Sequence, residues 1–345
     1  MKILIFVNKF DASDDLLGFF VGWVNKLLDK FEKITVITQH EGSYPKNSKL
    51  NLVSIDKDKN GRMARLFKYV KLLWKLRRDY DLVFVVMAPS WAIISSVVRI
   101  FGKKAYLWYA VWRGNWKLRI AEMLVNNIFS SVREAFPINS QKVVALGQGI
   151  DVEQFVPNES MRENNHILFL GRIAPVKRIE VLLKGLGKLR ASTFFLDIVG
   201  DVSSESDRKY LEDLRRIAYK SGIADRSNWV GRVGHNQTAP YYQRADIFIN
   251  LTPAGSFDKT MLEAMACGDL VLASNPAMAK FLSPKLRGLL IFREDDPDDL
   301  AEKLNRILNM NQQDKNQLRL GLRGVVVRNH SIEKWVENFT RAIIR

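Results

Sequence analysis

One carboxylate stands where this chain could bind a ligand that carries phosphate. Glu263 lies near the start of a short expected helix, residues 260–267, between two apolar runs at residues 247–251 and 270–273. These runs are too short for helices and are typical of buried parallel strands. The loop before such a helix, residues 252–259, lies at the carboxyl end of a strand, where free N–H groups at the helix start favour an anion. The pattern predicts a polar, phosphate-bearing ligand at this loop.

Glu263 also has a plainer interpretation. A carboxylate in the first turns of a helix interacts favourably with the helix dipole, by about 0.3–1 kcal/mol, whatever the helix binds. Leu262, Met265 and Ala266 would then simply form the buried face of that helix. The sequence around Glu263 decides between the two interpretations.

Three short motifs follow one another along this part of the chain. They read Trp229-Val230-Gly231-Arg232-Val233, Tyr242-Gln243-Arg244-Ala245-Asp246 and Glu263-Ala264-Met265-Ala266-Cys267-Gly268. In this order they resemble the donor-sugar half of the retaining glycosyltransferases of family 4, the glycogen-synthase-like class with the glycosyltransferase B fold. The resemblance implies an α/β protein with two Rossmann-like domains that face a cleft, and a nucleoside diphosphate sugar as the donor.

The chain departs from the family pattern at one carboxylate. Relatives carry a first Glu eight residues before the position of Glu263, and this chain has Gly255 there. In relatives the loop after that Glu approaches the sugar largely through backbone N–H groups. The resemblance implies that the same loop contacts the donor here, through Gly255, Ser256, Phe257, Asp258, Lys259 and Thr260.

A second group of residues follows the apolar run 166–170 and leads into a helix. Gly171-Arg172-Ile173-Ala174-Pro175-Val176-Lys177-Arg178 resembles the Gly-Arg, loop and Lys-Gly element of the family, with Arg178 in place of the last glycine. In relatives the Arg and the Lys grip the donor diphosphate. A leaving diphosphate gains negative charge as the glycosidic bond breaks, and two fixed cations beside a helix N-terminus stabilise that charge. Two solvated cations on a loop are the alternative.

The resemblance assigns Arg172, Lys177 and Glu263 to catalysis, with Glu263 as the acceptor of ribose hydroxyls. Backbone groups of residues 229–233 would meet the nucleotide base, and glycines that end strands would let the backbone approach the ligand. The residues expected to contact the donor are Gly171, Gly200, Gly231, Arg232, Val233, Gly255, Ser256, Phe257, Asp258, Lys259 and Thr260. Neither a metal nor a cofactor is expected, because the four histidines are scattered and Asp56-Lys57-Asp58 lies in a lysine-rich turn.

The chain of 345 residues is long enough for two α/β domains. Apolar runs alternating with helical patterns predict strands at residues 2–7, 34–38, 50–55, 82–86, 105–109, 128–130 and 143–146. After a polar stretch, further strands are expected at residues 166–170, 194–199, 228–230, 247–251, 270–273 and 288–291. We expect a first domain at residues 1–155 and a second at 156–330. A helix at 331–345 buries Ile332, Trp335, Val336, Phe339 and Ile343, and returns to the first domain by family analogy.

Much of the formal net charge of +16 lies in the first half of the chain. From Arg62 to Arg78, cations are interleaved with apolar residues that include Phe67 and Trp74, and no acidic residue occurs. This pattern predicts a basic amphipathic helix, either with a solvated basic face or bound to an anionic membrane surface. We favour a membrane over nucleic acid, because aromatic residues among cations suit an interface and no nucleic-acid motif is evident.

Other features limit the class of protein. The single cysteine, Cys267, excludes an intrachain disulfide and suits inert packing. The uncharged run 82–98 contains Pro89 and suits a strand, a loop and a helix better than a membrane span. Residues 1–8 resemble a first strand rather than a signal peptide. We expect a cytoplasmic protein that is peripheral on the inner face of the membrane.

These observations favour one function and leave one alternative. The leading hypothesis is a retaining glycosyltransferase that moves a sugar from a nucleotide diphosphate donor to a glycan or lipid-linked acceptor. The alternative is a nucleotide-sugar-binding partner subunit with impaired catalysis. Gly255 motivates it, and so does Val111, which stands where many relatives carry a His after a first-domain strand.

Overall fold

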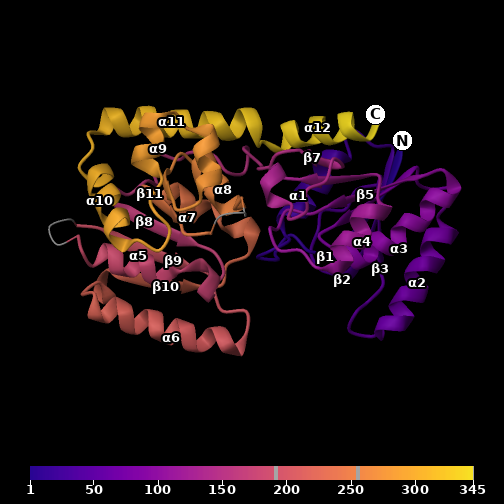
Figure 1. Ribbon diagram of the computed structural model, residues 1–345, viewed down its shortest axis with the longest axis horizontal. Helices are drawn as coiled ribbons and strands as arrows, with labels where there is room; N and C mark the ends of the chain where they lie inside the picture. Colours follow the sequence, from indigo (N-terminus) through magenta and orange to yellow (C-terminus); the bar gives the residue numbers. More distant parts are fainter. Residues whose placement is uncertain (190–192, 254–256, 345) are drawn as a thin grey trace. The chain divides into compact units, whose positions relative to one another are not determined.

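The computed structural model describes residues 1–189, 193–253 and 257–344 and divides into two compact units. The first unit contains Met1–Gly149, Gly234–Asn236 and the C-terminal helix, and the second contains Ile150–Val233 and Gln237–Ser331. Each unit is built on one parallel sheet flanked by helices (Figure 1). The predicted fold class, α/β with two parallel-sheet domains, is confirmed.

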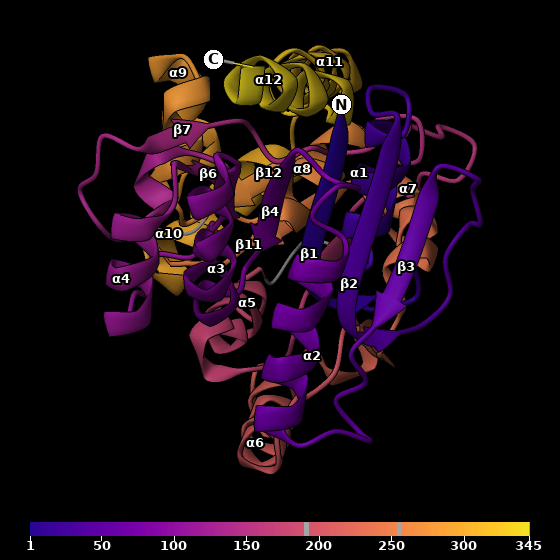
Figure 2. The same ribbon diagram turned by 90° about the vertical axis from the view of Figure 1, so that its right-hand side faces the viewer.

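The first unit contains a seven-stranded sheet in the order β3-β2-β1-β4-β5-β6-β7. Its strands are β1 (Lys2–Phe10), β2 (Lys33–Glu41), β3 (Leu50–Ser54), β4 (Leu82–Val86), β5 (Lys104–Trp108), β6 (Asn127–Ser130) and β7 (Val143–Ala145). Figure 2 shows β1, β2 and β3 side by side. Successive side chains of β1 point to opposite faces, so both faces of the sheet are buried.

Helices cover the two faces of this sheet. Ile3 and Ile5 of β1 pack in one cluster with α1 (Phe19–Leu27) and α12 (Ile332–Ile344). Leu4 and Phe6 pack in another cluster with α2 (Arg62–Lys75), α3 (Pro89–Ser95) and α4 (Trp116–Leu124). The predicted apolar face of α12 is buried, and its Trp335 lies 4.1 Å from Trp23 of α1, measured between ring centroids.

The second unit contains a five-stranded sheet in the order β10-β9-β8-β11-β12. Its strands are β8 (His166–Leu170), β9 (Phe195–Val199), β10 (Ser227–Gly231), β11 (Ile247–Asn250) and β12 (Leu270–Ala273). The helices are α5 (Ile179–Leu186), α6 (Glu205–Lys220), α7 (Ala239–Arg244), α8 (Lys259–Ala266), α9 (Pro284–Leu290), α10 (Pro297–Leu308) and α11 (Gln312–Asn329). Every predicted strand of this half is present except the last.

The strand expected at residues 288–291 was wrong. These residues end helix α9, and only Ile291 forms an isolated bridge, with Ala273. The helix forms because Ser283 accepts a hydrogen bond from the backbone N–H of Leu286 and Pro284 occupies the first helical turn. Capping therefore outweighed the short apolar run from which the strand was predicted.

The basic helix is shorter than expected. Helix α2 ends at Lys75, and the backbone at Leu76 departs from helical geometry, so the last two arginines of the predicted stretch lie beyond the helix. Within α2, Tyr69 and Leu73 are buried. None of the helices in the described part of the chain combines the length and the apolar composition that a membrane-spanning segment needs.

Candidate functional site

The second sheet has one point where the strand order reverses. The chain passes from β8 outward to β9 and β10 on one side, and β11 and β12 lie on the other side of β8. Ligands of such sheets bind outside the carboxyl ends of the strands at this reversal. The loops that leave the carboxyl ends of β8 and β11 carry the predicted phosphate and sugar residues. The topology therefore brings the two predicted groups to one place.

Lys177 and Asp258 form an ion pair between these two loops. The Lys177 Nζ lies 2.5 Å from the Asp258 Oδ2 and donates a hydrogen bond of 2.9 Å to the Thr252 Oγ1. Thr252 also donates to Asp258, and the Asn250 Nδ2 donates to it over 3.3 Å. Although burial favours the neutral acid, the charge and hydrogen bond of Lys177 lower the pKa of Asp258 to about 2. Lys177 is therefore a fixed cation held by an ionised carboxylate.

Arg172 differs from Lys177 because it is not held in place. Arg172 is exposed, and its side chain makes no hydrogen bond or ion pair with the described residues. The neighbouring Arg178 pairs with Glu294 and Asp295, and it has a positive φ of 49°. A positive φ accounts for the glycine that relatives carry at this position. Of the two cations predicted for phosphate binding, one is fixed and one is free to meet a ligand.

Three glycines bring the loops after β8, β9 and β10 together. The Gly171 N–H donates to the Val199 carbonyl over 2.9 Å, and the Gly200 N–H donates to the Gly231 carbonyl over 2.8 Å. A Cβ atom on Gly200 would lie 2.0 Å from the Gly171 carbonyl oxygen, and its φ is 138°. Only glycine fits there, so these loops can approach each other closely. Arg232 and Val233 follow directly, at the carboxyl end of the edge strand β10.

Glu263 lies inside helix α8 and is only 2% exposed. Its Oε2 accepts a hydrogen bond of 3.0 Å from the Tyr242 hydroxyl, which sequence reasoning missed. Burial, and then the charge of Glu263, raise the pKa of Tyr242 well above its usual value. Lys259, one turn earlier, is half-buried, and burial lowers its pKa to about 8. Phe257 is buried and Thr260 is half-buried, whereas Gly255 and Ser256 lie outside the described residues.

The described residues contain no group of three or more His, Cys, Asp or Glu that could hold a metal ion. In the Asp56-Lys57-Asp58 turn, Asp56 pairs with Lys59 and Asp58 pairs with His40. Both carboxylates therefore already have a partner within the first unit.

Comparison with known proteins finds a family that matches the part of the chain with this geometry. A family model described as Glycosyl transferases group 1 matches residues 164–310. In these residues the chain is similar to the group 1 glycosyltransferases. The family resemblance that the motifs predicted is thus confirmed for this part of the chain.

Curated relatives align with the same half. D-inositol 3-phosphate glycosyltransferase 2 of Catenulispora acidiphila is 28% identical over 184 residues, which cover 49% of this chain and 43% of that protein. Alpha-monoglucosyldiacylglycerol synthase of Streptococcus pneumoniae is 30% identical over 131 residues, which cover 38% of this chain and 29% of that protein. The chain thus spans less than half the length of these relatives.

Solved structures match the whole chain. HepE of Anabaena in complex with UDP-glucose has a TM-score of 0.80 and 13% identity, and the match covers 100% of this chain and 99% of that one. Sucrose-phosphate synthase from Thermosynechococcus elongatus has a TM-score of 0.79 and 17% identity, with 99% and 98% covered. At these identities the likeness establishes the fold, which is the glycosyltransferase B fold.

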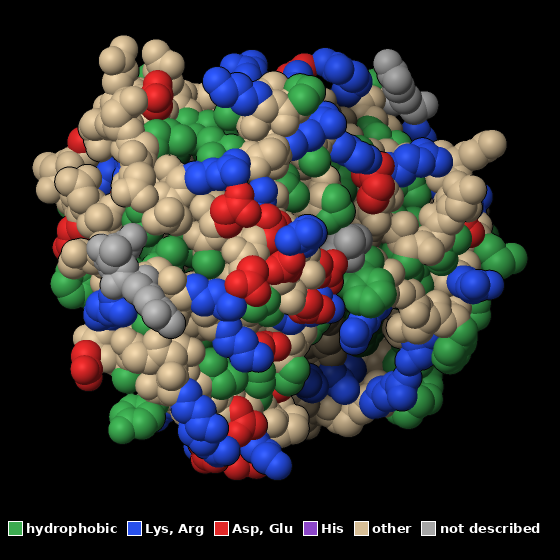
Figure 3. Space-filling view, turned by 60° about the vertical axis from the view of Figure 1, so that its left-hand side comes forward, with side chains coloured by type: hydrophobic (Ala, Val, Ile, Leu, Met, Phe, Trp, Pro, Cys, Tyr) green, Lys and Arg blue, Asp and Glu red, His purple; other side chains and the backbone are tan. Residues whose placement is uncertain are grey.

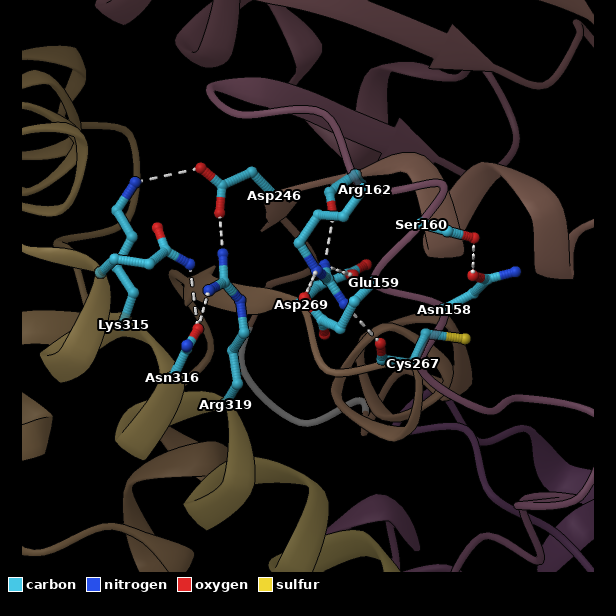
Figure 4. Close-up of polar contacts among 12 residues, drawn as sticks. Asn158, Glu159, Ser160, Arg162, Asp246, Cys267, Asp269, Lys315, Asn316 and Arg319 are labelled. Atoms are coloured by element: carbon cyan, nitrogen blue, oxygen red, sulfur yellow. Dashed lines mark hydrogen bonds and ion pairs between the residues drawn. The ribbon is translucent and has the colours of Figure 1, made fainter.

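One residue of the glycosyltransferase motifs lies away from the candidate site. Asp246 precedes β11, at the amino end of the strands, and is fully buried. Its Oδ2 lies 3.1 Å from the Lys315 Nζ, and its Oδ1 accepts a hydrogen bond from Arg319. Figure 4 shows both cations reaching Asp246 from α11. This part of the Tyr-x-x-Ala-Asp motif therefore anchors a helix instead of contacting a ligand.

A second buried carboxylate lies at the same edge. Asp269 precedes β12, and its Oδ1 lies 3.1 Å from Arg162, which also donates to the Cys267 carbonyl over 2.9 Å (Figure 4). Burial raises the pKa of Asp269 well above its usual value, although Arg162 opposes this. Arg162 thereby ties the segment that enters the second unit to the sheet of that unit.

A buried histidine lies next to the predicted sugar loop. The His330 ring is 5.1 Å from the Phe257 ring and 4.9 Å from the Phe281 ring, measured between centroids. The residue is 3% exposed, and neither ring nitrogen has a hydrogen-bond partner among the described residues. Burial, followed by the charge of Lys259, lowers the pKa of His330 to about 4. The neutral ring therefore acts as an aromatic packing residue.

We expect His330→Phe to stabilise the domain. An apolar ring of similar size removes two unpaired buried nitrogens, each of which costs about 1–3 kcal/mol. In an unfolded chain the pKa of a His is about 6.5. Between that value and about 4 the unfolded chain binds a proton that the folded chain does not. Stability of the wild type therefore falls as pH falls through this window, and the variant should lose this dependence.

Thermal unfolding at pH 7 and pH 4.5 measures both effects. The Tm of His330→Phe should exceed that of the wild type by several degrees, and by more at pH 4.5. His40→Phe is the control, because His40 is partly exposed and pairs with Asp58. A lower Tm for His330→Phe at pH 7 would show that the ring nitrogens are satisfied in solution.

Proposed function

We propose that the protein is a retaining glycosyltransferase that uses a nucleoside diphosphate sugar and needs no metal ion. The observation that carries this proposal is the fixed ion pair of Lys177 and Asp258, with the free Arg172 nearby in sequence, at the strand reversal of a group 1 glycosyltransferase domain. A cation held beside a helix start is suited to a diphosphate, and a carboxylate is suited to sugar hydroxyls.

The residues provide the chemistry of the transfer. The acceptor oxygen bonds to the anomeric carbon while the bond from that carbon to the diphosphate oxygen breaks. The negative charge that grows on the leaving diphosphate is stabilised by Lys177 and Arg172 more strongly in the transition state than in the bound donor. The leaving phosphate oxygen takes the acceptor proton on the same face of the sugar, so the configuration is retained.

The names of the relatives support the classes of donor and acceptor. HepE was crystallised with UDP and with UDP-glucose. One relative is named as a synthase of a monoglucosyldiacylglycerol, and others as glycosyltransferases of D-inositol 3-phosphate. We infer a glycan or lipid-linked acceptor for this protein, reached at the cytoplasmic face of a membrane.

A screen of nucleotide sugars tests the proposal. A donor that binds only the folded state stabilises it by about 2.7 kcal/mol at a concentration of 100 times its Kd. We expect one class of nucleotide sugar to raise the Tm and to be hydrolysed slowly or transferred. Binding without any turnover would favour the partner subunit with impaired catalysis, which Gly255 and Val111 motivate. If no nucleotide sugar raises the Tm, the proposal fails.

We further propose that the first unit binds an anionic membrane surface through helix α2 and its neighbour η1 (Ser96–Phe101). Phe67 is 70% exposed and Trp74 is 55% exposed, although both are large and apolar. The Trp74 ring lies 5.4 Å from that of Phe101, and Arg77 lies over Trp74 at 4.5 Å from the ring centroid. Exposed aromatic residues beside cations suit the boundary of anionic lipid headgroups.

The face drawn in Figure 3 bears on the choice of partner. Across the middle of the face in Figure 3, Lys and Arg side chains lie next to Asp and Glu side chains. This part of the face therefore does not provide the continuous basic track that a nucleic acid backbone needs. The apolar and basic surface of α2 favours lipid instead.

Reversing the charge of α2 and of Arg78, which follows it, should abolish salt-sensitive binding to anionic vesicles. Lys68, Lys71, Lys75 and Arg78 are all exposed, and each contributes about 1 kcal/mol near such a surface. The measurement is co-sedimentation with phosphatidylglycerol vesicles at low and high salt, with the four residues changed to Glu. The control reverses four exposed cations of the second unit, Arg208, Lys209, Arg216 and Lys220. Equal loss in both variants would mean that net charge, and not α2, causes the binding.

A further inference from the structure

Asp258 occupies the position that normally caps a helix, yet it does not cap helix α8. It directly precedes α8 with an extended backbone, φ −74° and ψ 132°, and its side chain makes no cap hydrogen bond. Aspartate is among the preferred residues at such a position because its oxygen accepts a backbone N–H of the first turn. Here the carboxylate turns to Lys177, Thr252 and Asn250 instead. Helix capping therefore does not explain this residue.

The two oxygens of Asp258 have different surroundings. The hydrogen bonds from Lys177, Thr252 and Asn250 all reach Oδ2. Oδ1 makes no hydrogen bond to the described residues, and the side chain is 17% exposed. An ionised carboxylate has about four acceptor positions and no donor. Asp258 therefore has one fixed oxygen and one oxygen that is free to accept hydrogen bonds from a ligand.

Lys177 also keeps part of its hydrogen-bonding capacity for a ligand. An ammonium group has three N–H donors, and two of those of Lys177 are used for Asp258 and Thr252. The third donor is left for a phosphate oxygen. The pair can therefore meet a phosphate through the nitrogen of Lys177 and a hydroxyl through the Oδ1 of Asp258. Adjacent phosphate and hydroxyl groups are what a nucleoside diphosphate sugar presents.

We propose that Asp258 accepts a hydroxyl of the donor sugar and so supplies the carboxylate that the family pattern has at the position of Gly255. The proposal rests on the proposed function, because it assigns the sugar end of the same donor site. It makes Asp258 a residue that determines which sugar is accepted. A sugar that lacks the hydroxyl leaves a partly buried charge without its partner, which is the strongest form of discrimination a polar site offers.

The rival interpretation is that Asp258 only balances the charge of Lys177. In that case the carboxylate competes with the donor diphosphate for Lys177, and its removal strengthens the binding of every ligand with a diphosphate. The two interpretations predict opposite changes in the affinity for the nucleotide sugar when the carboxylate is removed. The nucleoside diphosphate alone lacks the sugar and therefore serves as the internal reference.

Asp258→Asn separates the two interpretations, because Asn keeps the size of the side chain and removes its charge. Calorimetric titration with UDP-glucose and with UDP measures the two affinities; if the nucleotide screen selects another donor, that donor and its diphosphate replace them. We expect the affinity for the nucleotide sugar to fall about tenfold or more, as when a hydrogen bond to a charged group is lost. The affinity for the diphosphate should hold or rise. A rise in both affinities, or an equal fall in both, would overturn the proposal.

Donor analogues that each lack one sugar hydroxyl provide a second test. The wild type should bind one of these analogues about tenfold more weakly than the parent donor. Asp258→Asn should bind that analogue with nearly the affinity that it has for the parent donor. Equal losses in wild type and variant for every analogue would show that Asp258 contacts no hydroxyl. Because each comparison is made within one protein, a general loss of affinity in the variant does not affect it.

Two further variants control for folding and charge. Asp258→Glu keeps the charge beside Lys177, so it should bind the diphosphate like the wild type while its preference among sugars changes. Asp298→Asn removes an exposed carboxylate that pairs with Lys188, and it should change neither affinity. If the wild type binds no nucleotide sugar, the proposed function fails. If it binds one and Asp258→Asn discriminates among sugars as the wild type does, only this inference fails.

Discussion

Arg172→Ala and Lys177→Ala should each lower kcat by about 10²-fold or more, the usual effect of removing a group that stabilises charge in a transition state. The two variants should differ in stability. Arg172 is exposed and has no partner among the described residues, so its removal should leave the Tm unchanged. Lys177 is the cation that pairs with the mostly buried Asp258, so its removal should also lower the Tm.

Steady-state transfer assays and thermal unfolding measure these effects separately. Lys184→Ala is the matched control, because Lys184 is an exposed cation on α5 of the same unit. It should change neither kcat nor the Tm. If both Arg172→Ala and Lys177→Ala transfer sugar at the rate of the wild type, the phosphate site lies elsewhere in the protein.

The largest loss of stability is expected for Asp246→Asn. The substitution keeps the shape of the side chain but leaves Lys315 and Arg319, each 4% exposed, without their buried counter-charge. Breaking a buried ion pair in this way costs about 3–5 kcal/mol. A domain is stable by only about 5–15 kcal/mol, so this is a large fraction of the total. The loss should be confined to the second unit, where all three residues lie.

Hydrogen exchange read by mass spectrometry can localise the effect. Exchange should accelerate in peptides of β11 and α11, while peptides of the first unit should keep their wild-type rates. Glu302→Ala is the control, because both side chains of the Glu302–Arg306 pair are exposed, at 59% for Glu302 and 60% for Arg306. Such an exposed pair contributes only about 0–1 kcal/mol. Unchanged exchange in Asp246→Asn would show that water replaces the lost carboxylate charge.

Local pattern determined most of the elements of this fold. The bounds of β4, β8 and β12 agree with the predicted strands, because short apolar runs between turn residues satisfy backbone hydrogen bonding and burial in only one way. The apolar face of α12 follows from helical spacing alone. The exception was the strand predicted at residues 288–291, where a cap at Ser283 formed a helix.

The sequence also determined where the chemistry is concentrated. The order of the motifs located the part of the chain that matches the family model, and the glycine of relatives at the position of Arg178 corresponds to a positive φ here. Which motif residues face a ligand was not readable in the same way. Asp246 and Glu263 both belong to motifs, but Asp246 anchors α11 at the amino end of the strands, whereas Glu263 lies in α8, the helix that follows the predicted sugar loop.

Tertiary structure alone decided the pairings of charged groups. Lys177 and Asp258 are 81 residues apart, and Asp246 and Arg319 are 73 residues apart. Each pair depends on the order β10-β9-β8-β11-β12, which places β8 beside β11 and lets α11 reach the amino end of the sheet. Residue type and spacing specify an element because its hydrogen bonds are local. The partner of a buried charge is set by which strands become neighbours, and that is a property of the whole sheet.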